Sequence, residues 1–199
     1  MGNLLIENHQ IGESVENALI EWTKNYTKNR ISFALFNDAQ NIKDDQLRFI
    51  CLSRCLELFH KENFIIPKPF TPYFEELHRF MIEHSLSDIP AEKFTNKKQV
   101  TLATRIYDLA RNVFDNMKKE RLVFGHLTNL NNCQKITDTR NYYIHFDNTS
   151  ENKAWKLEEL FFTNFQLTTF IRVLFLKQFG FSDSTIELLV QSAKRKFFN

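Results

Sequence analysis

The stretch LFFTNFQLTTFIRVLFLKQFG, residues 160–180, is the most apolar part of the sequence and indicates the fold class. Its length fits one long helix, and the stretch carries the polar side chains of Asn164, Gln166, Arg172 and Lys177. A membrane span needs about 20 consecutive, predominantly apolar residues, so this pattern favours a helix buried in a protein core. Gly180 directly follows the stretch, where a glycine commonly ends a helix.

The composition of the chain points to a single helical domain. Only four glycines and four prolines are present, too few for the frequent turns of a β-sandwich or barrel. The 21 phenylalanines supply ample material for a core, and a length of 199 residues suits one sizeable domain. We therefore expect an all-α fold in which residues 1–199 form a single helical bundle.

Apolar residues recur at helical spacing along most of the chain. The predicted helices cover residues 14–36 with a break near Asn29, 44–60, 71–84, 102–117, a segment around RNYYIH that ends near 147–152, 156–179 and 182–198. The helix at 71–84 follows the breaker IIPKPFTP, with Thr71 as its cap and Pro72 in its first turn. Polar residues at 85–98 predict a loop.

The three cysteines show neither a disulfide framework nor a metal site. Cys51 and Cys55 lie one helical turn apart in an apolar stretch, and Cys133 stands alone. Because CxxC and zinc-like Cys/His spacings are absent from the sequence, they are predicted to be reduced core thiols. The N-terminus lacks the pattern of a secretory signal, so we expect a cytoplasmic protein without metal, cofactor or membrane contact.

The hexapeptide RNYYIH, Arg140–His145, is the best candidate for a chemical site. An arginine followed five residues later by a histidine is a common coincidence, so spacing alone carries no weight. The same or a similar spacing occurs three more times: Arg79–His84, Arg121–His126 and Arg54–His60. Arg79 lies opposite an apolar stripe, Gly125 interrupts the second pair, and the third pair occupies the polar side of its helix. These three pairs are therefore interpreted as surface or loop residues.

Arg140 differs from these rivals because it lies within an apolar stripe. At about 100° per residue, its neighbours on the helical wheel are Ile136, Tyr143 and Ile144. An adjoining polar edge contains Asp138, Asn141 and His145. A guanidinium in such a place stays charged and needs an anion. Two interpretations remain open: a structural ion pair with Glu57 or Glu16 from another helix, or a site in which Arg140 binds a substrate.

The longer stretch TDTRNYYIHFD, residues 137–147, resembles the signature of HEPN domains, in which R-x4–6-H often appears as Arg-Asn-x3-His. More specifically, it is similar to the ApeA-like HEPN branch of bacterial anti-phage defence proteins. Three other stretches support that branch in the same order along the chain: EWTKNY, RFICLSRCLELFHK and FLKQFGFSDSTIELL. The resemblance therefore extends over nearly the whole sequence.

The resemblance implies a metal-independent endoribonuclease on a HEPN-type helical bundle. Arg140, Asn141 and His145 would be its catalytic residues, supported by Asp138 and Glu57. Known HEPN enzymes combine two such motifs in one cleft, so a chain with one convincing motif is expected to form a homodimer. Many ApeA-like proteins carry an additional N-terminal domain. This chain would be a stand-alone form or the C-terminal effector part of a longer protein, controlled by a sensor domain or regulatory partner.

Cleavage of RNA suits these residue types because the 2′-OH of RNA is itself the nucleophile. A histidine transfers protons near neutral pH, and an arginine stabilises the charge that grows on the phosphate. Tyr142 and Tyr143 are predicted to stack on an unpaired base, with core packing as the alternative for Tyr143. The formal net charge of +2 implies local contact with RNA. The alternative to catalysis is a HEPN-like module that binds RNA or a nucleotide, or that dimerises.

Overall fold

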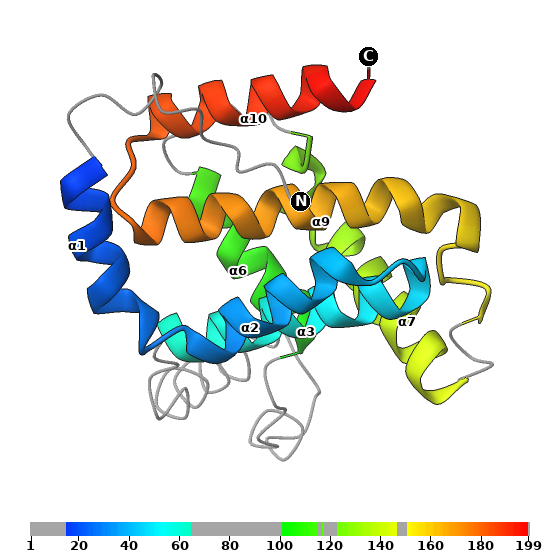
Figure 1. The fold of residues 1–199 in the computed structure, drawn as a ribbon. Coiled ribbons are helices and arrows are strands. Elements are labelled where there is room, and N and C mark those ends of the chain that lie inside the picture. The colour runs from blue at the N-terminus through cyan, green and yellow to red at the C-terminus, as the bar shows by residue number, and fades with distance from the viewer. Residues whose placement is uncertain (1–14, 65–100, 115–116, 118–122, 147–150, 199) are drawn as a thin grey trace, which may run out of the picture. The chain divides into compact units, whose positions relative to one another are not determined.

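The computed structural model describes residues 15–64, 101–114, 117, 123–146 and 151–198 (Figure 1). These ranges contain seven α-helices, one 3₁₀-helix and no strand, which confirms the predicted all-α fold. The elements are α1 (Val15–Tyr26), α2 (Arg30–Asn41), α3 (Asp45–Asn63), α6 (Leu102–Phe114), η4 (Gly125–Thr128), α7 (Leu130–His145), α9 (Leu157–Gln178) and α10 (Asp183–Phe198). The helix predicted at 71–84 and the loop predicted at 85–98 lie outside the described residues.

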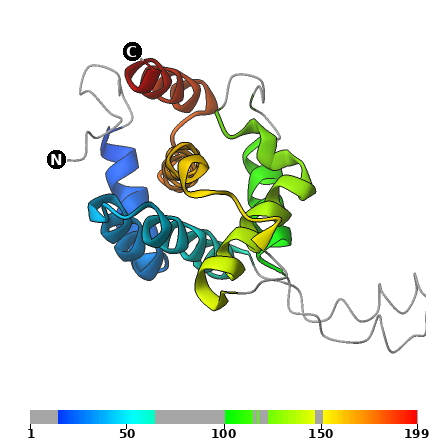
Figure 2. The same ribbon diagram turned by 90° about the vertical axis from the view of Figure 1, so that its right-hand side faces the viewer.

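The long helix α9 occupies the centre of the unit to which the described helices belong. Figure 2, which looks along α9, shows it surrounded by α1 to α3, by α6 and α7, and by α10. Most residues of α9 between Leu160 and Leu176 are buried, as the apolar stretch predicts. Burial of apolar surface stabilises a fold by roughly 25 cal/mol per Å², so this helix contributes strongly to the stability of the core.

The polar residues of α9 are used inside the bundle. Gln166 Nε2 donates to the carbonyl of Val123 (2.9 Å), and Lys177 Nζ donates to the carbonyl of Val113 (3.1 Å). These bonds satisfy carbonyls near the ends of neighbouring elements, which helps to fix α9 against them. Among the described helices, none has an apolar segment of the length that a lipid bilayer requires.

An aromatic cluster joins α2, α3 and α9. Phe33 stacks on Phe175, with centroids 4.0 Å apart and an interplanar angle of 12°, and also stacks on Phe179 at 5.7 Å. Phe59 meets Phe175 edge to face at 5.4 Å. Such pairs contribute about 0.5–1.5 kcal/mol each beyond their buried area, so the phenylalanines fix how these three helices pack.

The predicted helix ends near Asn29 and Gly180 are confirmed. The first helical segment breaks between Tyr26 and Arg30, where Asn29 is fully buried and its Nδ2 donates to the carbonyl of Asn25 (3.2 Å). Gly180 has a φ of 78°, a left-handed conformation that glycine adopts without the steric penalty of a Cβ. Asn29 and Gly180 therefore lie at the helix ends that the sequence predicts.

The cysteines are free thiols, as expected. Cys55 and Cys133 are buried, and Cys51 is partly buried. Burial raises the pKa of the Cys133 thiol to about 12. The Cys55 Sγ donates to the carbonyl of Ser32 (3.3 Å), which links α3 to α2. Thiols held in this way are protonated near neutral pH and act as core residues.

His60 corrects the prediction that Arg54 and His60 are both surface residues. Its side chain is buried because α6 packs on this side of α3. Nδ1 lies 3.0 Å from Arg105, and Nε2 lies 3.5 Å from Asp108. Burial, followed by the charge of Arg105, lowers the pKa of His60 despite the opposing effect of Asp108. A neutral imidazole can accept a hydrogen bond from Arg105, so His60 is a core polar residue.

Candidate functional site

The RNYYIH segment forms the last turns of α7. Asn129 caps the start of this helix, where its side chain accepts a hydrogen bond from the backbone N–H of Asn131 (2.9 Å). The helix ends at His145, and the N–H of Phe146 donates to the carbonyl of Tyr142 (2.7 Å). Phe146 has a φ of 49° and is 77% exposed. This end therefore combines an exposed aromatic ring with a left-handed backbone that bulky residues rarely adopt.

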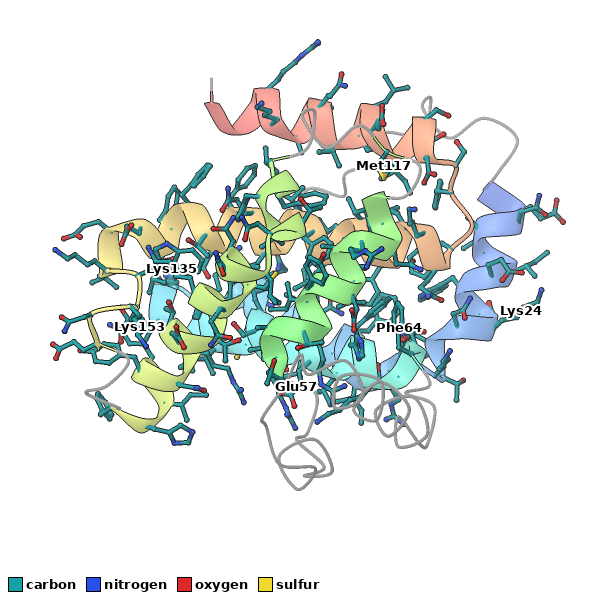
Figure 3. The ribbon with its side chains drawn as sticks, turned by 180° about the vertical axis from the view of Figure 1, so that it is seen from behind. Lys24, Glu57, Phe64, Met117, Lys135 and Lys153 are labelled. Atoms are coloured by element: carbon teal, nitrogen blue, oxygen red, sulfur yellow. The ribbon has the colours of Figure 1, made fainter. Side chains whose placement is uncertain are left out.

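Arg140 faces α3 from α7. Its side chain is 24% exposed, and one terminal guanidinium nitrogen lies 3.6 Å from Oε2 of Glu57. Figure 3 labels Glu57 on α3, close to α6 and α7. Arg140 Nε is shielded from solvent and has no hydrogen-bond partner. The guanidinium therefore has a nearby carboxylate but uses little of its hydrogen-bonding capacity.

Two other cations lie closer to Glu57 than Arg140 does. Its Oε2 accepts a hydrogen bond from Arg54 NH1 (2.8 Å), and its Oε1 accepts one from Lys61 Nζ (2.7 Å). Burial opposes ionisation of this carboxyl, but the hydrogen bonds from Lys61 and Arg54 outweigh it and lower the pKa of Glu57. Three cations thus share one carboxylate, and Arg140 makes the longest of the three contacts.

The polar edge of α7 lies beside Arg140. His145 is exposed at the end of the helix, and Asn141 is partly exposed one turn before it. Asp138 Oδ1 accepts a hydrogen bond from Gln134 Nε2 (2.9 Å) on the same helix. The structure therefore brings Glu57 to Arg140, while Asp138 interacts along its own helix.

The two tyrosines of RNYYIH differ in their surroundings. Tyr143 donates its hydroxyl to the carbonyl of Trp155 (3.0 Å), and burial, then nearby Tyr142 and the glutamates Glu158 and Glu159, raise its pKa. The Tyr142 ring meets the Tyr143 ring edge to face at 5.1 Å and is only partly buried. Tyr143 thus ties α7 to the segment before α9, and Tyr142 keeps an accessible face.

A family model described as Apea-like HEPN matches residues 52–185, which is more than half of the chain. The protein belongs to the Apea-like HEPN family. The searches of curated proteins and of solved structures found no match. The matched segment includes Glu57, Arg140 and His145, so both sides of the α3–α7 ion pair lie within the HEPN domain.

The rival pairs show no comparable arrangement within the described part of this HEPN domain. Arg54 is an exposed partner of Glu57, whereas His60 is buried against α6. His126 is partly buried, which lowers its pKa, and its backbone carbonyl accepts a hydrogen bond from Asn132. Arg79, His84 and Arg121 lie outside the described residues.

Arg54 and Lys61 contact the carboxylate of this site but were not among the residues predicted from the sequence. Their spacings from Glu57, three residues before it and four after it, place all three on one face of a helix. The spacing of these three residues is visible in the sequence, whereas their proximity to Arg140 depends on the packing of α7 on α3. Across the described ranges, no group of three or more His, Cys, Asp or Glu side chains is placed to hold a metal ion.

Proposed function

We propose that this HEPN protein is a metal-independent endoribonuclease of a toxin or anti-phage defence type. The observation that carries the proposal is the guanidinium of Arg140, which lies inside the matched HEPN segment with an unpartnered Nε and only a long contact to Glu57. Such a group can bind a phosphate oxygen without first breaking a strong internal pair. The exposed His145 lies on the same helix, five residues further on.

The proposed reaction is attack of a 2′-OH on the adjacent phosphorus. A histidine removes the 2′-OH proton as the new P–O bond forms, and another acid protonates the 5′-oxygen as its bond to phosphorus breaks. His145 and its copy on a second subunit supply these two roles. Arg140 stabilises the charge on the phosphoryl oxygens, and Asn141 donates to one of them or orients His145. The products are a 2′,3′-cyclic phosphate and a 5′-OH.

A symmetric homodimer completes the proposed site. One chain supplies one convincing motif, and cyclic dimers are the commonest symmetric assemblies. The dimer would place both copies of α7 at one cleft, with Tyr142 offering a ring for an unpaired base. A sensor domain or regulatory partner outside this chain would control the nuclease in the cytoplasm.

A second candidate is a non-catalytic HEPN module that binds RNA or a nucleotide, or that dimerises. The observation in its favour is that Arg140 already has a carboxylate, Glu57, within its own subunit. In this case Arg140 has a structural role, and His145 has no role in catalysis. The two candidates share the fold, and only the first predicts that RNA is cut.

The decisive experiment incubates the purified chain with end-labelled RNA in EDTA over a range of protein concentrations. We expect cleavage that yields 5′-OH ends and cyclic phosphates, with a rate per chain that rises as dimers form. Light scattering on the same samples measures the dimer fraction. Activity that requires added magnesium or manganese would contradict the proposed mechanism, and full activity in a strictly monomeric sample would contradict the composite site. A dimer that binds RNA and leaves it intact would support the second candidate.

A further inference from the structure

A second pair of cations lies away from α7, where α2, α3 and α9 meet. Arg48 is in the first turns of α3, and Arg172 is on α9. Asn164 of α9 donates to the backbone carbonyl and to Oδ1 of Asp45, less than one turn before Arg48, so the start of α3 packs on the face of α9 that carries Arg172. In keeping with this packing, burial and then the charge of Arg48 lower the pKa of the Arg172 guanidinium. Both remain protonated near neutral pH because the pKa of arginine is so high.

Contacts within the bundle hold Arg172 in place. Its NH2 donates to Oε1 of Gln40 on α2 (3.2 Å), and its guanidinium carbon lies 5.9 Å from the centroid of the Phe36 ring. Phe36 is buried, so its ring limits the orientations that the guanidinium can adopt. A guanidinium whose orientation is fixed in this way loses less conformational entropy when it binds a ligand.

Neither arginine has a carboxylate partner in the described part of the chain. The nearest acidic residues in sequence to Arg48 have other interactions: Asp44 Oδ1 accepts from the N–H of Leu47 (2.7 Å), and Asp45 Oδ1 accepts from Asn164 Nδ2 (3.1 Å). Arg48 Nε is shielded from solvent and has no hydrogen-bond partner. A buried donor without a partner is destabilising, and so is an uncompensated pair of like charges.

Thr168 adds a third unpartnered group at this place. Its hydroxyl oxygen is buried and has no hydrogen-bond partner. Thr168 is one turn before Arg172 and one turn after Asn164, so it lies on the face of α9 that meets the start of α3. Two guanidinium groups and a hydroxyl donor from two helices therefore converge without an anion to balance them.

We infer that Arg48, Arg172 and Thr168 form a binding site for a dianionic phosphate group. Arginine matches the oxygens of a phosphate with paired, charge-assisted hydrogen bonds, and a threonine hydroxyl can donate a further bond. Both arginine side chains are partly exposed, so a phosphate can reach them. The phosphate can come from a free nucleotide or from the 5′ end of an RNA.

This phosphate site is separate from the site on α7. Glu57, which contacts Arg140, is nine residues after Arg48 on α3. At 1.5 Å and 100° per residue, this separation amounts to about 14 Å along the axis and opposite sides of the helix. The inference is therefore independent of the proposed nuclease activity.

The test measures the thermal unfolding of the full chain in inorganic phosphate against chloride of equal ionic strength. At ten times the dissociation constant, a bound ligand raises Tm by about 3–6 °C for a chain of this size. Phosphate also stabilises proteins non-specifically, so the Arg48→Gln/Arg172→Gln double variant provides the reference. We expect this variant to lose the phosphate-dependent shift and, because the repulsion is removed, to melt no lower than the native chain in chloride.

Two further variants keep the test decisive. Arg111→Gln removes an exposed arginine on α6 and should retain the full phosphate shift. Arg48→Lys serves as the test variant if the double glutamine variant does not fold. It keeps the charge but not the paired donors, so it should retain only part of the phosphate-dependent shift in Tm. An equal shift in the native chain and the double variant would overturn the inference, as would loss of the shift in Arg111→Gln.

Two more titrations identify the source of the phosphate. AMP and ATP serve as nucleotide probes, and a short 5′-phosphorylated RNA is compared with its 5′-OH counterpart. Tighter binding of AMP or ATP than of inorganic phosphate, lost in the double variant, indicates a nucleotide. A preference for 5′-phosphorylated over 5′-OH RNA, lost in the same variant, indicates an RNA end. Binding of either probe that is unchanged in the double variant would count against the site.

Discussion

Arg140 lies 3.6 Å from Glu57, a carboxylate that already accepts shorter hydrogen bonds from two other cations. The contact has two consequences. It explains how an arginine can occupy an otherwise apolar stripe of α7 without a strong partner of its own. It also means that the α3 carboxylate keeps Arg54 and Lys61 as partners when Arg140 is removed or binds elsewhere.

Arg140→Ala is expected to lower the free energy of unfolding by no more than about 1 kcal/mol, because the ion pair is long and partly exposed. RNA cleavage should fall by about 100-fold or more, as for other groups that stabilise transition-state charge. Calorimetry and cleavage assays on the same preparation measure both effects. A loss of about 3–5 kcal/mol, typical of breaking a buried pair, would identify Arg140 as a structural residue.

His145→Ala should leave stability unchanged within about 0.5 kcal/mol, because the side chain is exposed at the end of α7. Its cleavage rate should fall by about 10²–10⁴-fold if the imidazole transfers a proton. His126→Ala is the matched control, since it alters the rival R-x4-H pair. Cleavage lost in His126→Ala and kept in His145→Ala would assign the site to the Arg121–His126 pair and contradict the role proposed for His145.

Glu57→Gln should lower Tm at pH 7 by about 2–4 °C, equivalent to about 1 kcal/mol from partly exposed ion pairs. The hydrogen bonds that lower the pKa of Glu57 stabilise the fold above the pKa of the unfolded carboxyl, about 4.3. That stability is lost as the pH falls through the lower pKa of the folded state. The Tm difference between wild type and variant should therefore shrink in acid. A difference that is constant from pH 7 to pH 3 would show that the carboxylate charge contributes nothing.

Phe146→Gly is expected to raise Tm by about 1–4 °C. The left-handed backbone of Phe146 costs a non-glycine residue about 1–2 kcal/mol, of which the greater freedom of glycine in the unfolded chain offsets about 0.4–1 kcal/mol. The ring is mostly exposed, so little packing is lost. Phe146→Ala, which keeps the backbone penalty, should show no such gain. A lower Tm for Phe146→Gly would mean that the ring itself stabilises the protein.

Local patterns in the sequence determined the helices. The break near Asn29, the long buried helix before Gly180 and the all-α class each follow from apolar spacing and from residues that end helices. The Apea-like HEPN family was likewise readable from short stretches, above all TDTRNYYIHFD. These features depend on neighbours within a few residues, which is the range over which helical periodicity carries information.

Only the tertiary structure decided which helix faces meet. The sequence left Arg140 with Glu57 or Glu16 as possible partners, and the packing of α7 against α3 selected Glu57. The packing of α6 on another side of α3 buried His60, although the periodicity of α3 predicted an exposed residue. The packing of α9 on α3 likewise brought the face of α9 that carries Arg172 to the start of α3, where Arg48 lies 124 positions earlier in the sequence. A helical wheel gives the direction of a side chain but not the identity of the helix opposite, because that choice depends on how all the apolar faces are buried together.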